Sequence, residues 1–249
     1  MRCFIVGRGR LGTTLASALA DVGVDVALSS HEDVPASPLG HGDAIFLTVP
    51  DAAIAAVAAR VTQWPSVAPY HLVHCAGVLG TDVLGRGGYV PVAMHPFQTI
   101  EQGAPATALR GIPWGVSGSA QAVEWARTIV DTLNGTAIVI PDTEASRARY
   151  HATAVLACNM VQTYLRAAQM LAMEQGIDAA TLLGPIVRTT VEQALRAMQG
   201  GRNVPLTGPV VRGDATTIER HLESLPPELA AIHRLGIEAT MLVLGNETP

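Results

Sequence analysis

Lysine is absent from this chain of 249 residues, so all 16 basic residues are arginines. This excludes Schiff-base chemistry and lysine as a general acid, and protons must move through His, Asp, Glu, Tyr, Cys or water. Long apolar runs are also missing, because none approaches the roughly 20 residues of a membrane span. The first apolar run is broken by Gly7, Arg8 and Arg10. We therefore expect a cytoplasmic protein without a membrane partner.

The chain also has only three cysteines and no net positive charge. Cys3, Cys75 and Cys158 lie far apart, with no C-x-x-C pair and no histidine spacing suited to zinc. Neither a disulfide framework nor a metal site is expected, and the thiols should be buried and reduced. The net charge of -5, with no basic cluster, argues against a nucleic-acid partner. At 49% hydrophobic and 15% charged residues, the chain should bury a large core in one or two domains.

Three glycines with G-x-G-x-x-G spacing follow the first apolar run and precede an alanine-rich range, 13–22. The pattern predicts a strand, a tight turn and a helix whose N-terminal N–H groups meet a pyrophosphate. Gly7 permits the turn, Gly9 lets the backbone approach phosphate oxygens, and Gly12 lets the helix pack on the strand. The residues expected to bind a dinucleotide are Gly7, Arg8, Gly9, Arg10, Leu11, Gly12, Ser29, Ser30, Val49 and Pro50.

The second predicted strand, 24–30, ends in Ser29 and Ser30, with no acid at the tip where NAD-specific folds place Asp or Glu. Their hydroxyls, with Arg8 and Arg10, could accept a 2′-phosphate, which favours NADP and leaves NAD possible. The alternative is that both arginines are merely solvated. The range 31–43 is too short for a helix and a return strand, so one βα unit should be missing.

Strand and helix patterns alternate as far as residue 140, and strand patterns stop there. We predict an α/β fold, with a Rossmann-type, doubly wound sheet in residues 1–142, shortened after its second strand. Residues 143–249 should form an all-helical domain. Its expected helices are 143–175, 179–198, 214–222 and 227–244. The alanine, leucine and methionine content of the long first helix predicts a homodimer.

Candidate catalytic residues come from two places. His95 follows the predicted strand 89–94 and is fixed by a proline, and an ordinary histidine pKa suits a proton donor. A histidine at a loop can equally be structural. His151, Val155 and Asn159 are spaced four residues apart, within an arc of about 80° on a regular helix. Asn159 could orient a substrate oxygen and His151 could assist, unless this face is simply an interface.

Candidate substrate-binding residues lie in two loops. Arg212 could clamp a carboxylate or a cofactor phosphate, and Thr207 belongs to the same loop. A structural explanation is also complete, because Asp214 is a good N-cap for the helix that follows. Ala76 and Gly77 follow another predicted strand and complete the set. Asp51 should cap the helix that runs through residue 60.

Together these motifs resemble one family: bacterial Rossmann-like proteins with a C-terminal helical domain of unknown function, related to pyrroline-5-carboxylate reductase, ketopantoate reductase and prephenate dehydrogenase. The residues that carry the resemblance are Gly7-x-Gly9-x-x-Gly12, Val49-Pro50-Asp51, His74-Cys-Ala-Gly77, His95-Pro-Phe-Gln-Thr99, Tyr150-His151 with Asn159, Leu206-Thr-Gly-Pro209 and Arg212-Gly-Asp214. The resemblance implies a nucleotide-binding domain, a helical dimerisation domain and NAD(P)-dependent oxidoreductase activity. His95-Pro96 is similar to the catalytic His-Pro of prephenate dehydrogenases.

Two departures from related families stand out. Val155 occupies the position of the lysine in the Lys-x-x-x-Asn motif of hydroxyacid dehydrogenases, and Ala76 stands where Ser is usual. The expected activity is hydride transfer between NADP, or NAD, and a small polar ketone, imine or alcohol. Two alternatives stay open: a catalytically silent nucleotide-binding sensor or scaffold, and a non-redox enzyme that uses His95 as acid or base.

Overall fold

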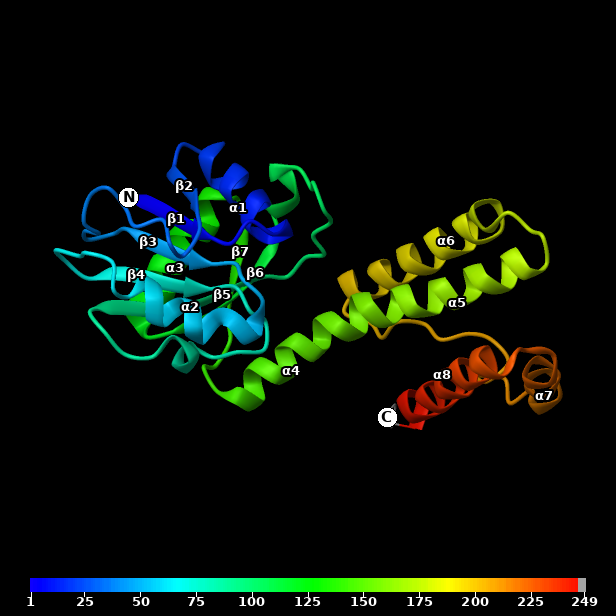
Figure 1. The fold of residues 1–249 in the computed structure, drawn as a ribbon. Coiled ribbons are helices and arrows are strands. Elements are labelled where there is room, and N and C mark those ends of the chain that lie inside the picture. Colours follow the sequence, from blue (N-terminus) through cyan, green and yellow to red (C-terminus); the bar gives the residue numbers. More distant parts are fainter. Residues whose placement is uncertain (246–249) are drawn as a thin grey trace. The chain divides into compact units, whose positions relative to one another are not determined.

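The computed structural model describes residues 1–245 and divides into two compact units, Met1–Cys158 and Asn159–Pro249 (Figure 1). The division falls later than the predicted boundary after residue 142. Helix α4 (Glu144–Ala154) explains the difference, because its side chains Arg147 and Tyr150 pack against the sheet of the first unit. No helix within residues 1–245 is long and apolar enough to cross a bilayer.

The first unit is built on a seven-stranded sheet in the order β2-β1-β3-β4-β5-β6-β7. Strands β1 to β5 run parallel, β6 pairs antiparallel with β5, and β7 runs parallel to β6. This arrangement confirms the predicted Rossmann-type fold class. The strands are β1 (Arg2–Val6), β2 (Asp25–Ser29), β3 (Ala44–Leu47), β4 (Tyr70–His74), β5 (Tyr89–Pro96), β6 (Pro113–Gly118) and β7 (Thr136–Val139).

Helices cover both faces of this sheet because its strands are apolar on both sides. In β1, Cys3 and Ile5 face the core shared with α1 (Arg10–Ala20) and α3 (Ala120–Thr132). Phe4 and Val6 face the opposite core, shared with α2 (Ile54–Val61). Short 3₁₀ turns connect these elements: η1 (Asp51–Ala53), η2 (Thr81–Leu84) and η3 (Ala106–Leu109).

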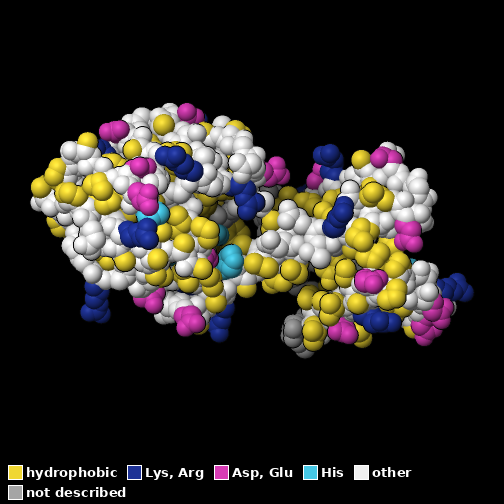
Figure 2. All heavy atoms as spheres, in the orientation of Figure 1, with side chains coloured by type: hydrophobic (Ala, Val, Ile, Leu, Met, Phe, Trp, Pro, Cys, Tyr) yellow, Lys and Arg dark blue, Asp and Glu magenta, His cyan; other side chains and the backbone are white. Residues whose placement is uncertain are grey.

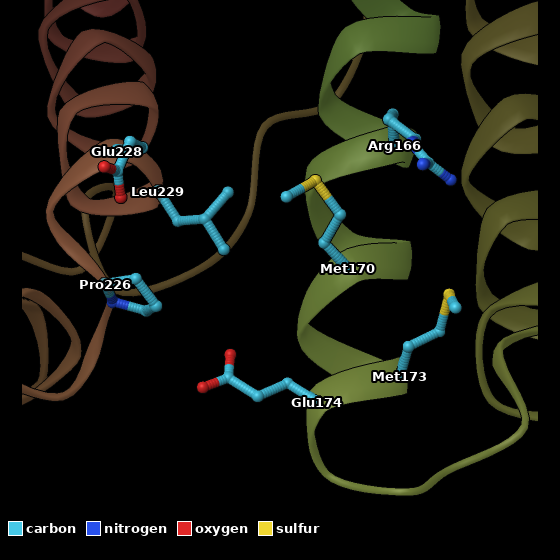
Figure 3. A pocket seen from close by; sticks show the side chains of 7 residues that line it. All are labelled: Arg166, Met170, Met173, Glu174, Pro226, Glu228 and Leu229. Carbon is cyan, nitrogen blue, oxygen red and sulfur yellow. The ribbon is translucent and has the colours of Figure 1, made fainter.

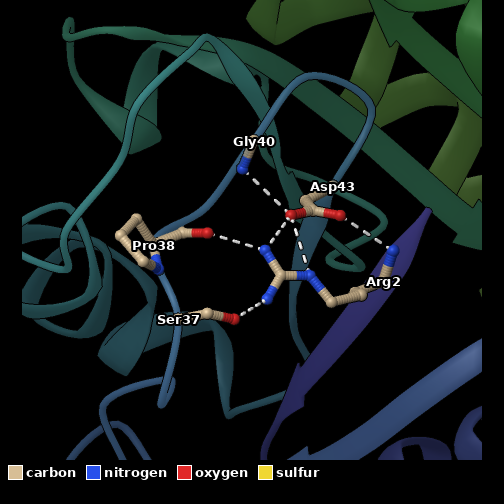
Figure 4. A network of polar contacts seen from close by, with 5 residues as sticks. All are labelled: Arg2, Ser37, Pro38, Gly40 and Asp43. Carbon is tan, nitrogen blue, oxygen red and sulfur yellow. Dashed lines mark hydrogen bonds and ion pairs between the residues drawn. The ribbon is translucent and has the colours of Figure 1, made fainter.

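The connection from β2 to β3 contains no helix, as its length predicted. A polar network holds its end against β1 (Figure 4). Arg2 Nε donates to Asp43 Oδ2 at 3.1 Å, and Arg2 Nη2 donates to the Pro38 carbonyl at 2.7 Å. Asp43 also accepts the Gly40 N–H at 2.9 Å, and Arg2 bonds Ser37 Oγ. The ion pair between Arg2 and Asp43 therefore fixes the end of this helix-free connection to β1.

The second unit is helical, as predicted. A π-helix, η4 (Val155–Met160), leads from α4 into α5 (Val161–Glu174), and α6 (Ala179–Gln199), α7 (Ala215–Ser224) and α8 (Pro227–Gly245) follow. Few apolar side chains of these helices are buried, and Figure 2 shows apolar side chains gathered over them.

Two local predictions are wrong. Asp51 makes no capping hydrogen bond, because Pro50 precedes a 3₁₀ turn and α2 begins only at Ile54. His95 lies inside β5 rather than after it. The strand extends because β6 pairs with it in antiparallel fashion, placing Gly115 opposite His95.

Candidate functional site

The carboxyl ends of β1, β3, β4 and β5 lie along one edge of the sheet, because these strands run parallel. The loops that begin at Gly7, Thr48 and Cys75 leave from this edge, and His95 lies near it at the end of β5. Ligands of doubly wound sheets bind at this kind of edge. Val49, half-buried, and Pro50, exposed, belong to the same edge.

The glycine loop has the geometry that its spacing predicted. Gly7 has φ +125°, and a Cβ there would lie 2.7 Å from the carbonyl oxygen of Thr48. A Cβ on Gly12 would overlap the carbonyl oxygen of Gly7 and lie 2.5 Å from Thr48 Oγ1. The Thr48 hydroxyl in turn donates to the Gly7 carbonyl at 3.0 Å. Gly7 and Gly12 are therefore required for the turn and for the close packing of α1.

Gly9 differs from these two glycines, because a Cβ there would meet nothing within 4 Å. It is also the N-cap of α1, and no side chain caps the helix. The first-turn N–H groups, at Arg10, Leu11 and Gly12, have no acceptor within the helix. An open backbone next to an uncapped helix N-terminus fits the diphosphate of a dinucleotide.

No acid occupies the tip of β2 itself, as predicted, but an acid of the following loop lies beside it. The chain folds back after Ser30, so that Asp33 Oδ2 accepts the Ser30 N–H at 2.7 Å and lies 3.7 Å from Arg8 Nη2. Ser29 is only 7% exposed, and its carbonyl accepts the Gly7 N–H at 3.3 Å. The predicted 2′-phosphate site thus contains a carboxylate, while Arg10 is exposed on the first turn of α1.

His95 forms a cluster with two aromatic residues of α4. Its Nδ1 lies 3.1 Å from the Tyr150 hydroxyl, and its ring meets His151 edge to face with centroids 5.8 Å apart. Gly115 makes room for Tyr150, because a Cβ there would lie 2.8 Å from Cε1 of the tyrosine ring. Gly77 makes room for His151 in the same way, since its Cβ would overlap His151 Nδ1. Three predicted residues, His95, His151 and Gly77, are therefore brought together.

The protonation state of His95 differs from the expectation. Burial, with the nearby His151 as the next cause, lowers the pKa of His95 to about 4. The ordinary histidine pKa assumed from the sequence is therefore wrong at this position. At neutral pH the ring is uncharged, so it offers one N–H donor and one acceptor instead of acting as a cationic acid.

Arg147 organises the loop after β4. Its side chain is fully buried, and it donates to the carbonyls of Ala76 at 2.6 Å and Leu79 at 2.9 Å, and to Ser117 Oγ at 3.3 Å. No carboxylate pairs with it among the residues described, and burial lowers the pKa of its guanidinium. A buried cation satisfied by carbonyls fixes the backbone of this loop beside His151.

The other side chains after β4 are structural. His74 is fully buried, its Nδ1 accepts the Ala76 N–H at 3.2 Å, and its Nε2 donates to the Gly80 carbonyl at 3.0 Å. Burial raises the pKa of the Cys75 thiol to about 12, so this cysteine is inert, as expected. The Ala76 side chain is buried, and its peptide groups hold His74 and Arg147 in place.

Three predicted residues belong to the second unit. Asn159 is exposed in η4, and Thr207 and Arg212 are exposed between α6 and α7. The arc of about 80° for His151 and Asn159 assumed a regular α-helix, and the π-helix between them removes that basis. Asp214 caps α7 by accepting the Thr217 N–H at 3.1 Å, which confirms the predicted N-cap. The ligand-binding roles of Asn159, Thr207 and Arg212 stay predictions.

A groove in the second unit lies between α5 and the start of α8 (Figure 3). None of the predicted site residues lines it. Its lining residues are Arg166, Met170, Met173, Glu174, Pro226, Glu228 and Leu229. Within residues 1–245, no group of three or more His, Cys, Asp or Glu is placed to hold a metal ion.

Sequence reasoning missed several residues of the site. Thr48 and Arg147 received no role, Tyr150 appeared only in a motif, and Asp33 was not considered. Of these residues, only Tyr150 could have been identified from the sequence, because it directly precedes His151 and lies on the same helical turn. Arg147 is buried because β4, β6 and α4 come together around it. No local sequence pattern predicts this contact.

The fold and the glycine loop define a Rossmann-type α/β unit followed by a helical unit. The chain belongs to the family described as a domain of unknown function, DUF2520, whose family model matches residues 112–240. This match extends from the start of β6 into α8, and it confirms the resemblance drawn from the motifs. Among curated proteins, none matches the chain.

Solved structures share the fold over nearly the whole chain. A Bacteroides fragilis protein provisionally named an NADP oxidoreductase is 20% identical with a TM-score of 0.76, covering 96% of each chain. A Streptomyces aurantiacus imine reductase is 15% identical with a TM-score of 0.60, covering 96% of this chain and 93% of its own. A Plasmodium falciparum pyrroline carboxylate reductase, solved with NADP bound, is 14% identical with a TM-score of 0.57 and 96% coverage of each chain. At these identities the likeness concerns the fold.

Proposed function

We propose that this protein is an NADP-dependent oxidoreductase that transfers hydride between the cofactor and a small polar ketone, imine or alcohol. One observation carries the proposal: the open backbone at Gly9 and the uncapped start of α1 lie on the same sheet edge as His95. The names of the similar structures support it, since two are reductases and one holds NADP.

The residues on this edge of the sheet would bind different parts of the cofactor. The first turn of α1, with Gly9, would hold the diphosphate through backbone N–H groups. The bound cofactor would supply the hydride. Val49 and Pro50 would line the path along the edge toward His95, and Ser30 and Arg8 would meet the 2′-phosphate. Asn159, Thr207 and Arg212 are proposed to hold the substrate's polar groups.

His95 would act as a neutral residue. The Tyr150 hydroxyl donates to the His95 carbonyl at 3.4 Å and lies 3.1 Å from Nδ1. Both contacts are satisfied when the Nδ1–H donates to the tyrosine oxygen. The ring proton then lies on Nδ1, and Nε2 can accept a hydrogen bond from a substrate hydroxyl or N–H. In this arrangement His95 orients the reacting group while water exchanges the proton.

A silent nucleotide-binding sensor is the second candidate, and the low pKa of His95 favours it, because a neutral ring is a poor proton donor. The same pKa weakens the third alternative, a non-redox enzyme, since a group with a pKa of about 4 is a weak base at neutral pH.

Calorimetric titration with NADP(H) and NAD(H), followed by NADPH consumption over a panel of keto acids and cyclic imines, separates these functions. We expect binding and turnover. Tight binding with no turnover on any substrate would favour the sensor, and absence of binding at millimolar nucleotide would overturn both.

The role of His95 has its own test. His95→Ala should lower turnover at least about tenfold, whereas His95→Gln keeps a side chain that can accept and donate hydrogen bonds and should retain more activity than alanine. His41→Ala, at an exposed histidine, is the matched control. Equal activity of all three variants would remove His95 from the mechanism.

A homodimer through the helices of the second unit is also proposed, with the cytoplasm as its expected location. The support is the number of large apolar side chains that these helices expose, such as Met173 and Leu242, because exposed apolar patches mark association surfaces. Analytical ultracentrifugation across concentrations tests it, and a monomer at high concentration would contradict it.

A further inference from the structure

The cluster around His95 contains a buried positive charge. The side chain of Arg147 is fully buried, and its guanidinium donates to three uncharged oxygens, two backbone carbonyls and one serine hydroxyl. Its Cζ lies 5.6 Å from the centroid of the Tyr150 ring, and the hydroxyl of this ring lies 3.1 Å from His95 Nδ1. One aromatic ring therefore separates the charge from His95.

No carboxylate balances this charge at His95 within the part of the chain that the structure describes. Asp142 acts on Arg147 from a distance, but it accepts hydrogen bonds from the first residue of η2 and forms no ion pair with the guanidinium. Burial lowers the pKa of His95 most, and three neighbouring groups lower it further: His151, Arg147 and His74. A nearby acid would raise this pKa, and none of the described residues does so. The electrostatic potential at His95 is therefore positive.

His95 presents a free acceptor to this positive site. With the Nδ1–H directed at Tyr150, Nε2 carries a lone pair. Nε2 makes no hydrogen bond with the described residues, and unlike His151 Nδ1 it is not closed off from solvent. A group that binds Nε2 must donate a hydrogen bond, and the positive potential disfavours a donor that is itself a cation. A hydroxyl meets both conditions, whereas an ammonium or iminium group meets only the first.

We propose that the substrate pair of this protein is an alcohol and the ketone it forms, and that the buried charge of Arg147 disfavours amines and iminium ions. The alcohol hydroxyl donates to His95 Nε2. In the oxidation the C–H bond breaks and its electron pair leaves as hydride for the nicotinamide cofactor, the O–H proton passes to water, and the C=O bond forms. In either direction the oxygen carries partial negative charge as the hydride moves, and the positive potential stabilises it. This inference rests on the proposed function and narrows its substrate class.

Compounds matched in ring size test the substrate class. NADPH consumption is compared between cyclopentanone and pyrroline, and between cyclohexanone and tetrahydropyridine. We expect kcat/KM to be at least about tenfold higher for each ketone than for its cyclic imine. Faster or equal turnover of the imines would overturn this inference and leave the proposed function standing. No turnover of any ketone, keto acid or imine would overturn both.

Two substitutions of Arg147 separate its charge from its hydrogen bonds. Arg147→Gln removes the charge and Arg147→Lys keeps it, while both lose the guanidinium bonds to the loop after β4. Arg147→Gln should raise the imine-to-ketone ratio of kcat/KM about tenfold, and Arg147→Lys should keep it within about threefold of the wild type. Arg149→Gln, at an exposed arginine of the same helix, should change it by less than about twofold, because solvent screens this charge. Equal ratios in Arg147→Gln and Arg147→Lys would overturn the role of the charge.

Binding to the NADPH complex tests the same discrimination without turnover. Cyclohexanol and cyclohexylammonium share one ring, and only the second is a cation. In calorimetry the wild type should bind cyclohexanol at least about tenfold more tightly, and Arg147→Gln should narrow the difference. Equal affinities in the wild type, or no binding of either compound, would overturn the inference whether or not the variants fold. Failure of NADPH itself to bind at millimolar concentration would instead overturn the proposed function.

Discussion

The two units differ in where their apolar side chains lie. In the first unit, large side chains such as Phe46 and Trp114 are fully buried between sheet and helices. Among the described residues of the second unit only four apolar side chains are buried, and three of them are alanines: Ala172, Ala197, Leu229 and Ala230. Its larger side chains face outward, for example Met173 at 62% and Leu242 at 70% exposure.

This difference shows that the first unit has a large apolar core, whereas the second unit leaves many large apolar side chains exposed. A second copy of the chain is the cover we propose for them. The units can be observed separately, because all three tryptophans, Trp64, Trp114 and Trp125, belong to the first unit.

The largest expected effect is in the core of the first unit. Phe46→Ala removes a fully buried ring packed against Trp125 and should lower the free energy of unfolding by about 3–5 kcal/mol. Urea unfolding followed by tryptophan fluorescence measures it. Leu242→Ala should leave that transition within about 0.5 kcal/mol and instead weaken self-association. An equal loss of unfolding free energy in Phe46→Ala and Leu242→Ala would contradict the difference between the two units.

The glycine loop should give the next effect. Gly12→Ala forces a methyl group against the Gly7 carbonyl and Thr48, and should destabilise the first unit by about 1–3 kcal/mol. Gly9→Ala meets no neighbour, so its fluorescence-detected unfolding should match the wild type. If the proposed function holds, the alanine at residue 9 weakens nucleotide binding without changing stability. A Gly12→Ala protein as stable as Gly9→Ala would contradict the packing.

Acid stability gives a smaller effect. Burial lowers the pKa of His71 to about 4, below its unfolded value, so stability is full above the unfolded pKa and falls as the pH drops from about 6.5 toward 4. The His71 and Trp125 rings are stacked, with their centroids 4.0 Å apart. His71→Phe keeps an aromatic ring in this stack and removes the imidazole that titrates. The loss between pH 7 and pH 5 should shrink by about 1–2 kcal/mol. An unchanged acid slope in His71→Phe would contradict the predicted contribution of His71.

The helix caps should give the smallest effects, one in each unit. Ser119 accepts the Ala122 N–H at 3.2 Å at the start of α3, and Asp214 caps α7. Replacing either by alanine should cost about 1 kcal/mol. Ser119→Ala should appear in tryptophan fluorescence, and Asp214→Ala only in far-UV circular dichroism. A fluorescence shift in Asp214→Ala would show that the two units unfold together.

Local patterns predicted most of the architecture. The glycine spacing identified the turn before α1, and the short range 31–43 correctly excluded a helix between β2 and β3. These features depend on a few consecutive residues, so the sequence contains them directly. The extension of β5 through His95 depends on its pairing with β6, and a strand end defined by a partner strand cannot be found from periodicity alone.

The candidate site was predicted less completely. His95, His151 and Gly77 do meet, but the pKa of His95 comes from burial, which the sequence does not show. Arg147 is another example, because a polar residue in a polar stretch of helix is normally solvated. Asp33 was missed since the chain reverses within three residues and returns its carboxylate to Ser30.

The segment between β2 and β3 is tied down at both ends, by Asp33 at Ser30 and by Asp43 at Arg2. Between these ties, Val34 and Ala36 are exposed and bound to neither anchor. A foreign peptide grafted at this point would lengthen a surface loop at little entropic cost and leave both anchors intact. The protein therefore contains a ready attachment site for an epitope or a reporter at the rim of its sheet.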